Sequence, residues 1–108
     1  ALEAGGRGSR APALARCFRD GVRARSELGV LDASGAALRI DRLVELDEAL
    51  WILDFKWRCE AAQRDAYEQQ LSRYAAAVKQ ARPDKPVRTA LVLADGSLIE
   101  TAEAHRAA

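Results

Sequence analysis

The sequence predicts an α/β domain in which a mixed β-sheet is covered by one long helix. Three consecutive segments, 25–31, 36–46 and 50–56, alternate or run extended between turn signals, as β-strands do. A longer segment, 60–81, has helical spacing, and two strand-like runs then surround the turn Ala-Asp-Gly-Ser at 94–97. Because a long helix between the third and fourth strands suits a crossover connection, we expect both parallel and antiparallel strand pairs.

Turn signals bound each strand of the predicted three-strand meander. The first strand ends at Leu31, directly before the sequence Asp-Ala-Ser-Gly, and the second ends before Asp47-Glu48. In the second strand the apolar residues recur at a period of two, which assigns them to one face of the sheet. These residues are Leu38, Ile40, Val44 and Leu46. In the third strand, 50–56, one face would carry Trp51, Leu53 and Phe55, and the other Ile52, Asp54 and Lys56.

The helix is predicted from a change of period after Trp57. Its larger apolar side chains fall at Tyr67, Leu71, Tyr74 and Val78, which lie along one helical face. The alanine-rich composition also favours a helix. Pro83 ends it, because the residue before a proline is pushed out of the helical region.

Length and composition limit the classes of protein that the sequence can encode. A chain of 108 residues fits one domain with a modest core, and a net charge of +1 alone does not indicate a nucleic-acid binder. No apolar run reaches the roughly 18 residues of a membrane helix, and no export signal is visible, so we expect an intracellular protein with no membrane partner. Cys17 and Cys59 are expected to be reduced thiols. Residues 1–20 are expected to be a loose lead-in or a short helix with Pro12 in its first turn, cut from a longer chain, and 21–108 the domain.

Two aspartates interrupt the apolar strands of the second hairpin. A two-residue loop at Asp47-Glu48 would place Asp41 directly opposite Asp54, whereas a four-residue loop would pair Asp41 with Lys56. Either register puts all three side chains on one face. Two carboxylates about 5 Å apart repel by roughly 3 kcal/mol at an effective dielectric near 20, whereas a favourable cross-strand pair contributes only about 0.2–1 kcal/mol. The pair therefore requires compensation, either by a divalent cation such as Mg²⁺ or by a salt bridge to Lys56 or Arg39.

The order and spacing of these motifs resemble those of a known family. The pattern Asp-(12 residues)-Asp-x-Lys across a hairpin is similar to that of the PD-(D/E)XK nuclease superfamily. Over residues 22–101 the sequence resembles, more narrowly, the RecB-like nuclease domain of bacterial helicase–nucleases of the exodeoxyribonuclease V beta and AddA type. The motifs that carry the resemblance are RIDRLVE, LWILDFKWR, YEQQLSRYAAAV and VRTALVLADGSLIE. Trp57 and Arg58 depart from it, since relatives have a small residue and then glycine after the lysine.

The resemblance implies a fold and a set of site residues. The fold would be a restriction-endonuclease-like core, a mixed sheet flanked by helices. Asp41 and Asp54 would bind the metal together with the backbone carbonyl of Phe55, and Lys56 would orient or activate the attacking water or stabilise charge on the phosphate. Gln70 and Tyr74 would match a Gln-x-x-x-Tyr motif on the helix beside the site. Glu27 would match a glutamate of the first strand, as a further ligand or a residue supporting one.

The function implied by the resemblance is hydrolysis of DNA phosphodiesters, as an exodeoxyribonuclease that uses Mg²⁺, with Mn²⁺ able to substitute. The partners implied are DNA, a RecB-type helicase domain in the same parent chain and a second repair subunit, acting in double-strand-break repair and recombination in the bacterial cytoplasm. Two alternatives stay open at this point. One is a nuclease-fold module that has lost catalysis and serves DNA binding or complex assembly, and the other is a small protein-interaction domain whose acidic pair is salt-bridged.

Overall fold

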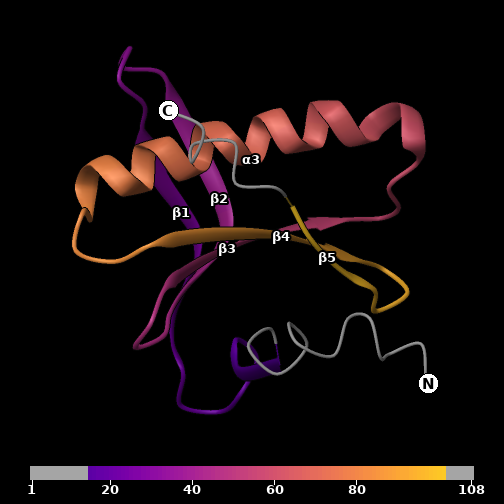
Figure 1. Ribbon diagram of the computed structural model, residues 1–108, viewed down its shortest axis with the longest axis horizontal. Coiled ribbons are helices and arrows are strands. Elements are labelled where there is room, and N and C mark those ends of the chain that lie inside the picture. Colours follow the sequence, from indigo (N-terminus) through magenta and orange to yellow (C-terminus); the bar gives the residue numbers. More distant parts are fainter. Residues whose placement is uncertain (1–14, 102–108) are drawn as a thin grey trace.

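A five-stranded sheet crossed on one face by a long helix forms the core of the computed structural model, which describes residues 15–101 (Figure 1). The helix, α3 (Ala61–Ala81), connects the third strand to the fourth. The strands lie in the sheet in the order in which they occur in the chain. They are β1 (Arg23–Leu31), β2 (Ala37–Glu45), β3 (Leu50–Lys56), β4 (Val87–Leu93) and β5 (Leu98–Glu100).

The sheet is mixed, as the sequence predicts. β3 and β4 are parallel, and the other three neighbouring pairs are antiparallel. A parallel pair needs a crossover connection, and α3 supplies it. The predicted α/β class and the order of the elements are therefore confirmed. None of the helices among residues 15–101 has the length and apolar character needed to cross a bilayer.

Most predicted boundaries lie within two residues of the observed ones. β1 begins at Arg23, two residues before the predicted start, and β2 ends at Glu45, one residue early. The short helix predicted around Pro12 lies mostly outside the described residues, although Ala15 and Arg16 are helical.

Helix α3 has a defined start and end. The backbone N–H of Glu60, the residue before the helix, donates to the side-chain oxygen of Gln63 at 3.1 Å, which satisfies a donor that the helix itself cannot pair. At the other end the N–H of Arg82 donates to the carbonyl of Val78 at 2.7 Å, directly before Pro83. These contacts define the ends of the helix, and its buried face is formed by Leu71, Tyr74, Ala75, Ala77 and Val78.

Apolar side chains pack on both faces of the sheet. On the face covered by α3, the central strand contributes Leu50 and Ile52 to a buried cluster that includes Leu71 and Val78 of the helix. On the opposite face Trp51 and Leu53 pack with Cys17, which precedes β1. In Figure 1 this preceding segment lies on the side of the sheet away from α3. Burial of each large side chain contributes about 1.5–3 kcal/mol, so β3, covered on both faces, is a rigid base for the residues at its end.

The alternation of side chains along β2 breaks at Asp41. Leu38, Ile40 and Leu43 contact the cluster on the α3 face, whereas Val44 contacts the opposite cluster. Strict alternation would put Ile40 and Val44 on the same face. The residue pairs between β1 and β2 keep one register throughout, so no extra residue causes the break. It coincides with Glu27, which faces Asp41 in that register and has a φ of 52°.

Candidate functional site

The hairpin register brings the two predicted aspartates opposite each other. Arg42 pairs with Leu53, and the pairing continues to Glu45 and Leu50. The backbone N–H of Leu46 then donates to the carbonyl of Ala49 at 2.9 Å, which closes a two-residue loop. Of the two registers left open by the sequence, the two-residue loop is therefore the correct one, and it places Asp41 across from Asp54.

Asp41 is fixed by the backbone of the neighbouring strand. Its Oδ2 accepts a hydrogen bond from the N–H of Phe55 at 2.8 Å, one position beyond the last paired residues of β2 and β3. The Asp41 side chain thus accepts the hydrogen bond of a backbone N–H that would otherwise pair with the neighbouring strand, at the point where β2 and β3 separate. Because the N–H and C=O of a residue in a strand point to the same side, the Phe55 carbonyl is directed toward the same edge as Asp41.

Asp54 is a buried carboxylate with incomplete compensation. The residue is 3% exposed, and its Oδ2 lies 3.1 Å from the Lys56 ammonium. This contact is an ion pair without hydrogen-bond geometry, so Oδ2 accepts no hydrogen bond within residues 15–101. Burial raises the pKa of Asp54, and the nearby Asp41 raises it further, while Lys56 acts in the opposite direction. The carboxylate therefore has a positive partner but no hydrogen bond at Oδ2, and its charged form is disfavoured by burial.

Helix α3 forms one wall of the site. The side-chain N–H of Gln70 donates to the Tyr74 hydroxyl at 3.0 Å. Burial raises the pKa of Tyr74, and the charges of Asp54 and Asp41 add to the effect, which places this hydroxyl in the field of both carboxylates. The two residues predicted on the helix are thus brought together with the acidic pair.

Sequence reasoning missed Tyr67 as a site residue. The Lys56 ammonium lies 4.6 Å from the centroid of the Tyr67 ring. Tyr67, Gln70 and Tyr74 are spaced three and four residues apart, which places them on one helical face. That spacing is the signal available in the sequence, but it predicts only a shared helical face and not the contact with Lys56.

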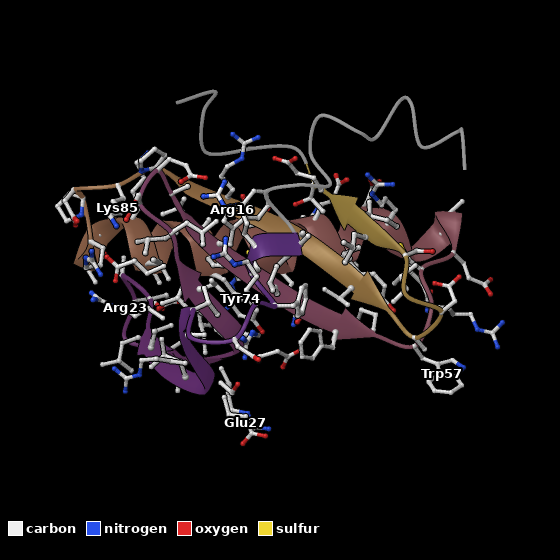
Figure 2. The ribbon with its side chains drawn as sticks, turned by 90° about the horizontal axis from the view of Figure 1, so that it is seen from below. Arg16, Arg23, Glu27, Trp57, Tyr74 and Lys85 are labelled. Atoms are coloured by element: carbon white, nitrogen blue, oxygen red, sulfur yellow. The ribbon has the colours of Figure 1, made fainter. Side chains whose placement is uncertain are left out.

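Glu27 does not join the acidic pair. Its side chain is exposed, and within residues 15–101 no group of three or more acidic, histidine or cysteine side chains gathers at a distance suited to one metal ion. In Figure 2, Glu27 and Trp57 project outward at separate places, whereas the buried Tyr74 lies near the middle of the view. The structure thus places Glu27 away from the position where it could act as the additional ligand.

The residues present suit a hard divalent cation that keeps part of its water shell. Mg²⁺ is commonly held by one or two carboxylates together with waters and substrate phosphates. Asp41 and Asp54 would supply the carboxylates, and the Phe55 carbonyl a further oxygen. The buried Asp54 Oδ2, which lacks a hydrogen-bond donor, is the observation that favours a cation there. Of the two residues predicted to compensate the pair by a salt bridge instead of a cation, Lys56 contacts Asp54, whereas Arg39 has an exposed side chain.

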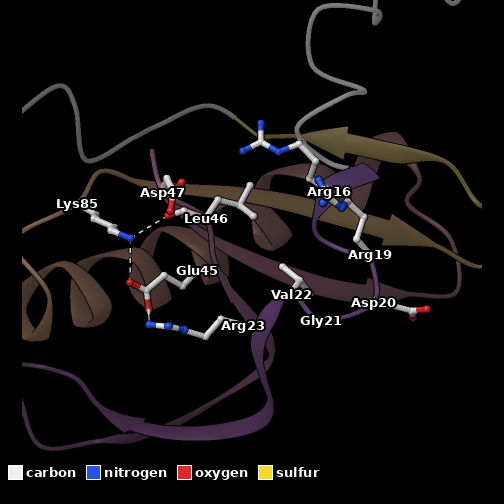
Figure 3. Close-up of a pocket in the computed structure, with 10 residues that line it drawn as sticks. All are labelled: Arg16, Arg19, Asp20, Gly21, Val22, Arg23, Glu45, Leu46, Asp47 and Lys85. Atoms are coloured by element: carbon white, nitrogen blue, oxygen red, sulfur yellow. Dashed lines mark hydrogen bonds and ion pairs between the residues drawn. The ribbon is translucent and has the colours of Figure 1, made fainter.

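A polar hollow of about 370 Å³ lies at the other end of the β2–β3 hairpin (Figure 3). Glu45 is its central charged group: the Lys85 ammonium contacts Glu45 at 2.8 Å and the Leu46 carbonyl at 2.9 Å, and Arg23 lies 3.9 Å from Glu45. This hollow is separated from Asp41 by half the length of β2, so it is not part of the acidic site.

No protein-family model matches the sequence, and no curated protein is significantly similar to it. A functional assignment therefore depends on the geometry of the acidic site and on the resemblance of its motifs.

Proposed function

We propose that this chain is a Mg²⁺-dependent deoxyribonuclease domain with a restriction-endonuclease-like core, of the RecB-like type. The observation that supports the proposal best is the meeting of Asp41 and Asp54 across the end of a hairpin, with the Lys56 ammonium 3.1 Å from the buried Asp54 oxygen. Two carboxylates and a lysine at one point are a costly arrangement for a fold, and they suit phosphodiester hydrolysis.

Each group has a chemical task in this proposal. A divalent cation supplies a nucleophilic water near neutral pH and stabilises charge on the phosphate. Asp41 and Asp54 bind that cation, and Asp41 is kept in place by the Phe55 N–H. Lys56 faces the same point and stabilises negative charge that develops on the phosphate oxygens. Gln70 and Tyr74, joined by a hydrogen bond, line the wall against which the DNA backbone lies.

The finer parts of the proposal come from the resemblance. The substrate is DNA, digested as an exonuclease, and the partners are a helicase domain of the same parent chain and a second repair subunit. The process is double-strand-break repair in the bacterial cytoplasm. A net charge of +1 is compatible with this division of labour, because the helicase would hold most of the DNA.

The proposal is tested by removing one negative charge at a time. We expect Asp41→Asn and Asp54→Asn each to weaken Mg²⁺ binding by more than about tenfold, because loss of even an outer-sphere partner costs 10- to 100-fold. Both variants should also abolish Mg²⁺-dependent cleavage of end-labelled DNA. Asp47→Asn is the matched control, since it makes the same change in the exposed turn of the same hairpin. Isothermal titration calorimetry and gel assays measure the two effects.

One observation favours the catalytically inactive module as a second candidate. Only two carboxylates gather among the described residues, and Lys56 already compensates one of them. An inactive module would release no heat with Mg²⁺ in either the wild type or Asp41→Asn, yet would retain DNA binding. The inactive module would be excluded if the wild type binds Mg²⁺ and cleaves DNA, and Asp41→Asn does neither.

A further inference from the structure

The ammonium group of Lys56 lies between two partners from different elements. Asp54 of the same strand approaches it at 3.1 Å, and the ring of Tyr67 on α3 lies 4.6 Å from it. The lysine side chain is 24% exposed, so its far side is open to solvent or to a bound molecule. One partner is a charge and the other is the face of an aromatic ring, which attracts cations through its quadrupole.

A lysine at this position needs a second partner if it is to act on a phosphate. Its ammonium is carried on a flexible four-carbon stem, so one contact leaves many orientations accessible. The contact to Asp54 also lacks hydrogen-bond geometry. When Asp54 shares its oxygens with a divalent cation, its attraction for Lys56 decreases, whereas the contact with the Tyr67 ring does not involve the carboxylate.

The Tyr67 ring is well placed to provide a fixed contact. It lies in the second turn of α3, whose start is fixed by the hydrogen bond between Glu60 and Gln63. The ring is partly buried and packs against the apolar cluster on the α3 face of the sheet. Aromatic side chains have few rotatable bonds, so a ring held in this way defines one position for the cation above it.

We propose that Tyr67 is a positioning residue that holds the Lys56 ammonium over its ring and so directs it toward a phosphate bound at Asp41 and Asp54. The part of this inference that concerns catalysis rests on the proposed nuclease function. The contact itself can be tested independently, because the chain has only three lysines, Lys56, Lys79 and Lys85.

The contact is tested by NMR of protein labelled with ¹³C at the lysine ε position. Protons that lie above an aromatic ring are shifted upfield, so the Lys56 signal should be displaced from those of Lys79 and Lys85. We expect the displacement to persist in Tyr67→Phe, which keeps the ring, and to be lost in Tyr67→Leu. Gln69→Leu, an exposed position of the same helix, is the control and should leave the signal unchanged. Tyr67→Met serves as a second variant without a ring if leucine lowers the helical circular dichroism.

The role in catalysis is tested by steady-state cleavage of DNA with Mg²⁺. Tyr67→Leu should lower kcat about tenfold, which corresponds to about 1.4 kcal/mol, with little change in KM, because the lysine acts on charge that develops in the transition state. Tyr67→Phe should restore most of kcat. Because phenylalanine also preserves the packing of Tyr67, kcat is expressed per folded protein, as measured by circular dichroism, and only a decrease that persists after this correction supports a positioning role.

Two results would overturn the inference while leaving the nuclease function intact. One is a Lys56 signal that is the same in the wild type and Tyr67→Leu, and the other is an unchanged kcat in that variant. A wild-type protein that cleaves no DNA would instead refute the nuclease function, and the catalytic role of Tyr67 with it. The NMR displacement would still decide whether the ring holds the lysine.

Discussion

At the scale of single residues, the buried carboxylate of Asp54 is unfavourable for folding. A carboxylate that is 3% exposed and accepts no hydrogen bond at Oδ2 among the described residues is disfavoured in its charged form. Its ion pair with Lys56 reduces this cost but does not remove it, since burial still raises the pKa of Asp54. Functional sites commonly retain such groups at the expense of stability.

We therefore expect Asp54→Asn to be more stable than the wild type at neutral pH. The amide removes the buried charge, and Lys56, 24% exposed, can turn its ammonium to water. The gain should be about 1 kcal/mol, because the desolvation cost of the buried carboxylate is removed while the remaining ammonium is exposed enough to be solvated. Thermal unfolding in the absence of divalent metal measures it. A less stable variant would show that the ion pair stabilises the fold.

The pH dependence of that difference has a definite sign. Because the folded-state pKa of Asp54 is raised, the folded protein binds the proton more readily than the unfolded chain, and stability decreases as the pH rises through the folded-state pKa. The advantage of Asp54→Asn should thus be present at about pH 7 and vanish near pH 3, below the ordinary aspartate pKa of about 3.9. Melting curves of both proteins across this range give the difference directly.

Part of this site was predictable at the residue scale and part was not. Asp41, Asp54 and Lys56 follow from the alternation of side chains in one hairpin, which is a local property. The contact of Lys56 with Tyr67 is not local, because it depends on how closely α3 docks against the end of β3. Sequence spacing fixes which face of a helix a residue occupies, but it does not fix which strand residue that face meets.

At the scale of elements, the alternation of side chains between the two faces of the sheet is interrupted at one point of the β1–β2 hairpin. Glu27 has a φ of 52°, a left-handed conformation that glycine adopts freely and other residues adopt at a cost. It faces Asp41, where the alternation of β2 also breaks. A non-glycine residue held in this conformation typically costs about 1–3 kcal/mol and persists only where the surrounding structure imposes it. Glu27 thus shapes the strand that carries Asp41, although its own carboxylate lies apart from the pair.

Substitutions at Glu27 should report this backbone strain. Glu27→Gly should be as stable as the wild type or slightly more stable, whereas Glu27→Val should be less stable than the glycine variant by about 1–2 kcal/mol, since a β-branched residue is poorly tolerated at positive φ. Urea denaturation of the three proteins gives the comparison. Equal stabilities would mean that the segment relaxes to an ordinary strand in solution.

The elements themselves were largely predictable, but this distortion was not. A period of two, turn sequences and prolines locate five strands and a helix to within a few residues. The left-handed residue is a glutamate, whereas glycine is the usual marker of that conformation. The strain is imposed by packing across two strands, so a single strand read by itself does not reveal it.

At the scale of the whole molecule, Glu45 forms ion pairs between two segments that are far apart in the sequence. Its carboxylate at the end of β2 contacts Arg82 at 3.1 Å and Lys85 at 2.8 Å, both in the connection from α3 to β4. Hydrogen bonds from Arg82 and then Lys85 lower the pKa of Glu45 to about 2. The end of the hairpin is therefore joined electrostatically to the connection that leads into the parallel strand.

We expect Glu45→Gln to lower the melting temperature modestly at neutral pH and low salt. A lowered folded-state pKa means that the stabilising contribution is present above the unfolded-state value, 4.5, and is lost as the pH falls toward about 2. The two proteins should therefore converge in acid, and the difference should shrink at high salt, which screens exposed charges. Melting curves against pH and salt test both. Convergence at high pH instead would contradict this role.

The overall architecture was predictable because one long helix between two strands leaves few topologies. The crossover requires a parallel pair, and short turns require antiparallel ones, so the mixed sheet follows. The interaction of Glu45 with Arg82 and Lys85 did not follow, because those residues are 37 and 40 positions away and meet only after α3 has packed.

The compact hairpin that carries Asp41, Asp54 and Lys56 also bears on the order in which the protein is assembled. All three lie on two neighbouring strands joined by a two-residue loop, and such hairpins form in microseconds. The pairing of β3 with β4 spans the whole of α3 and is slower, because a long loop must close first. We therefore expect a nascent chain to bring the acidic pair together before α3 docks beside it, even if the helix itself has already formed.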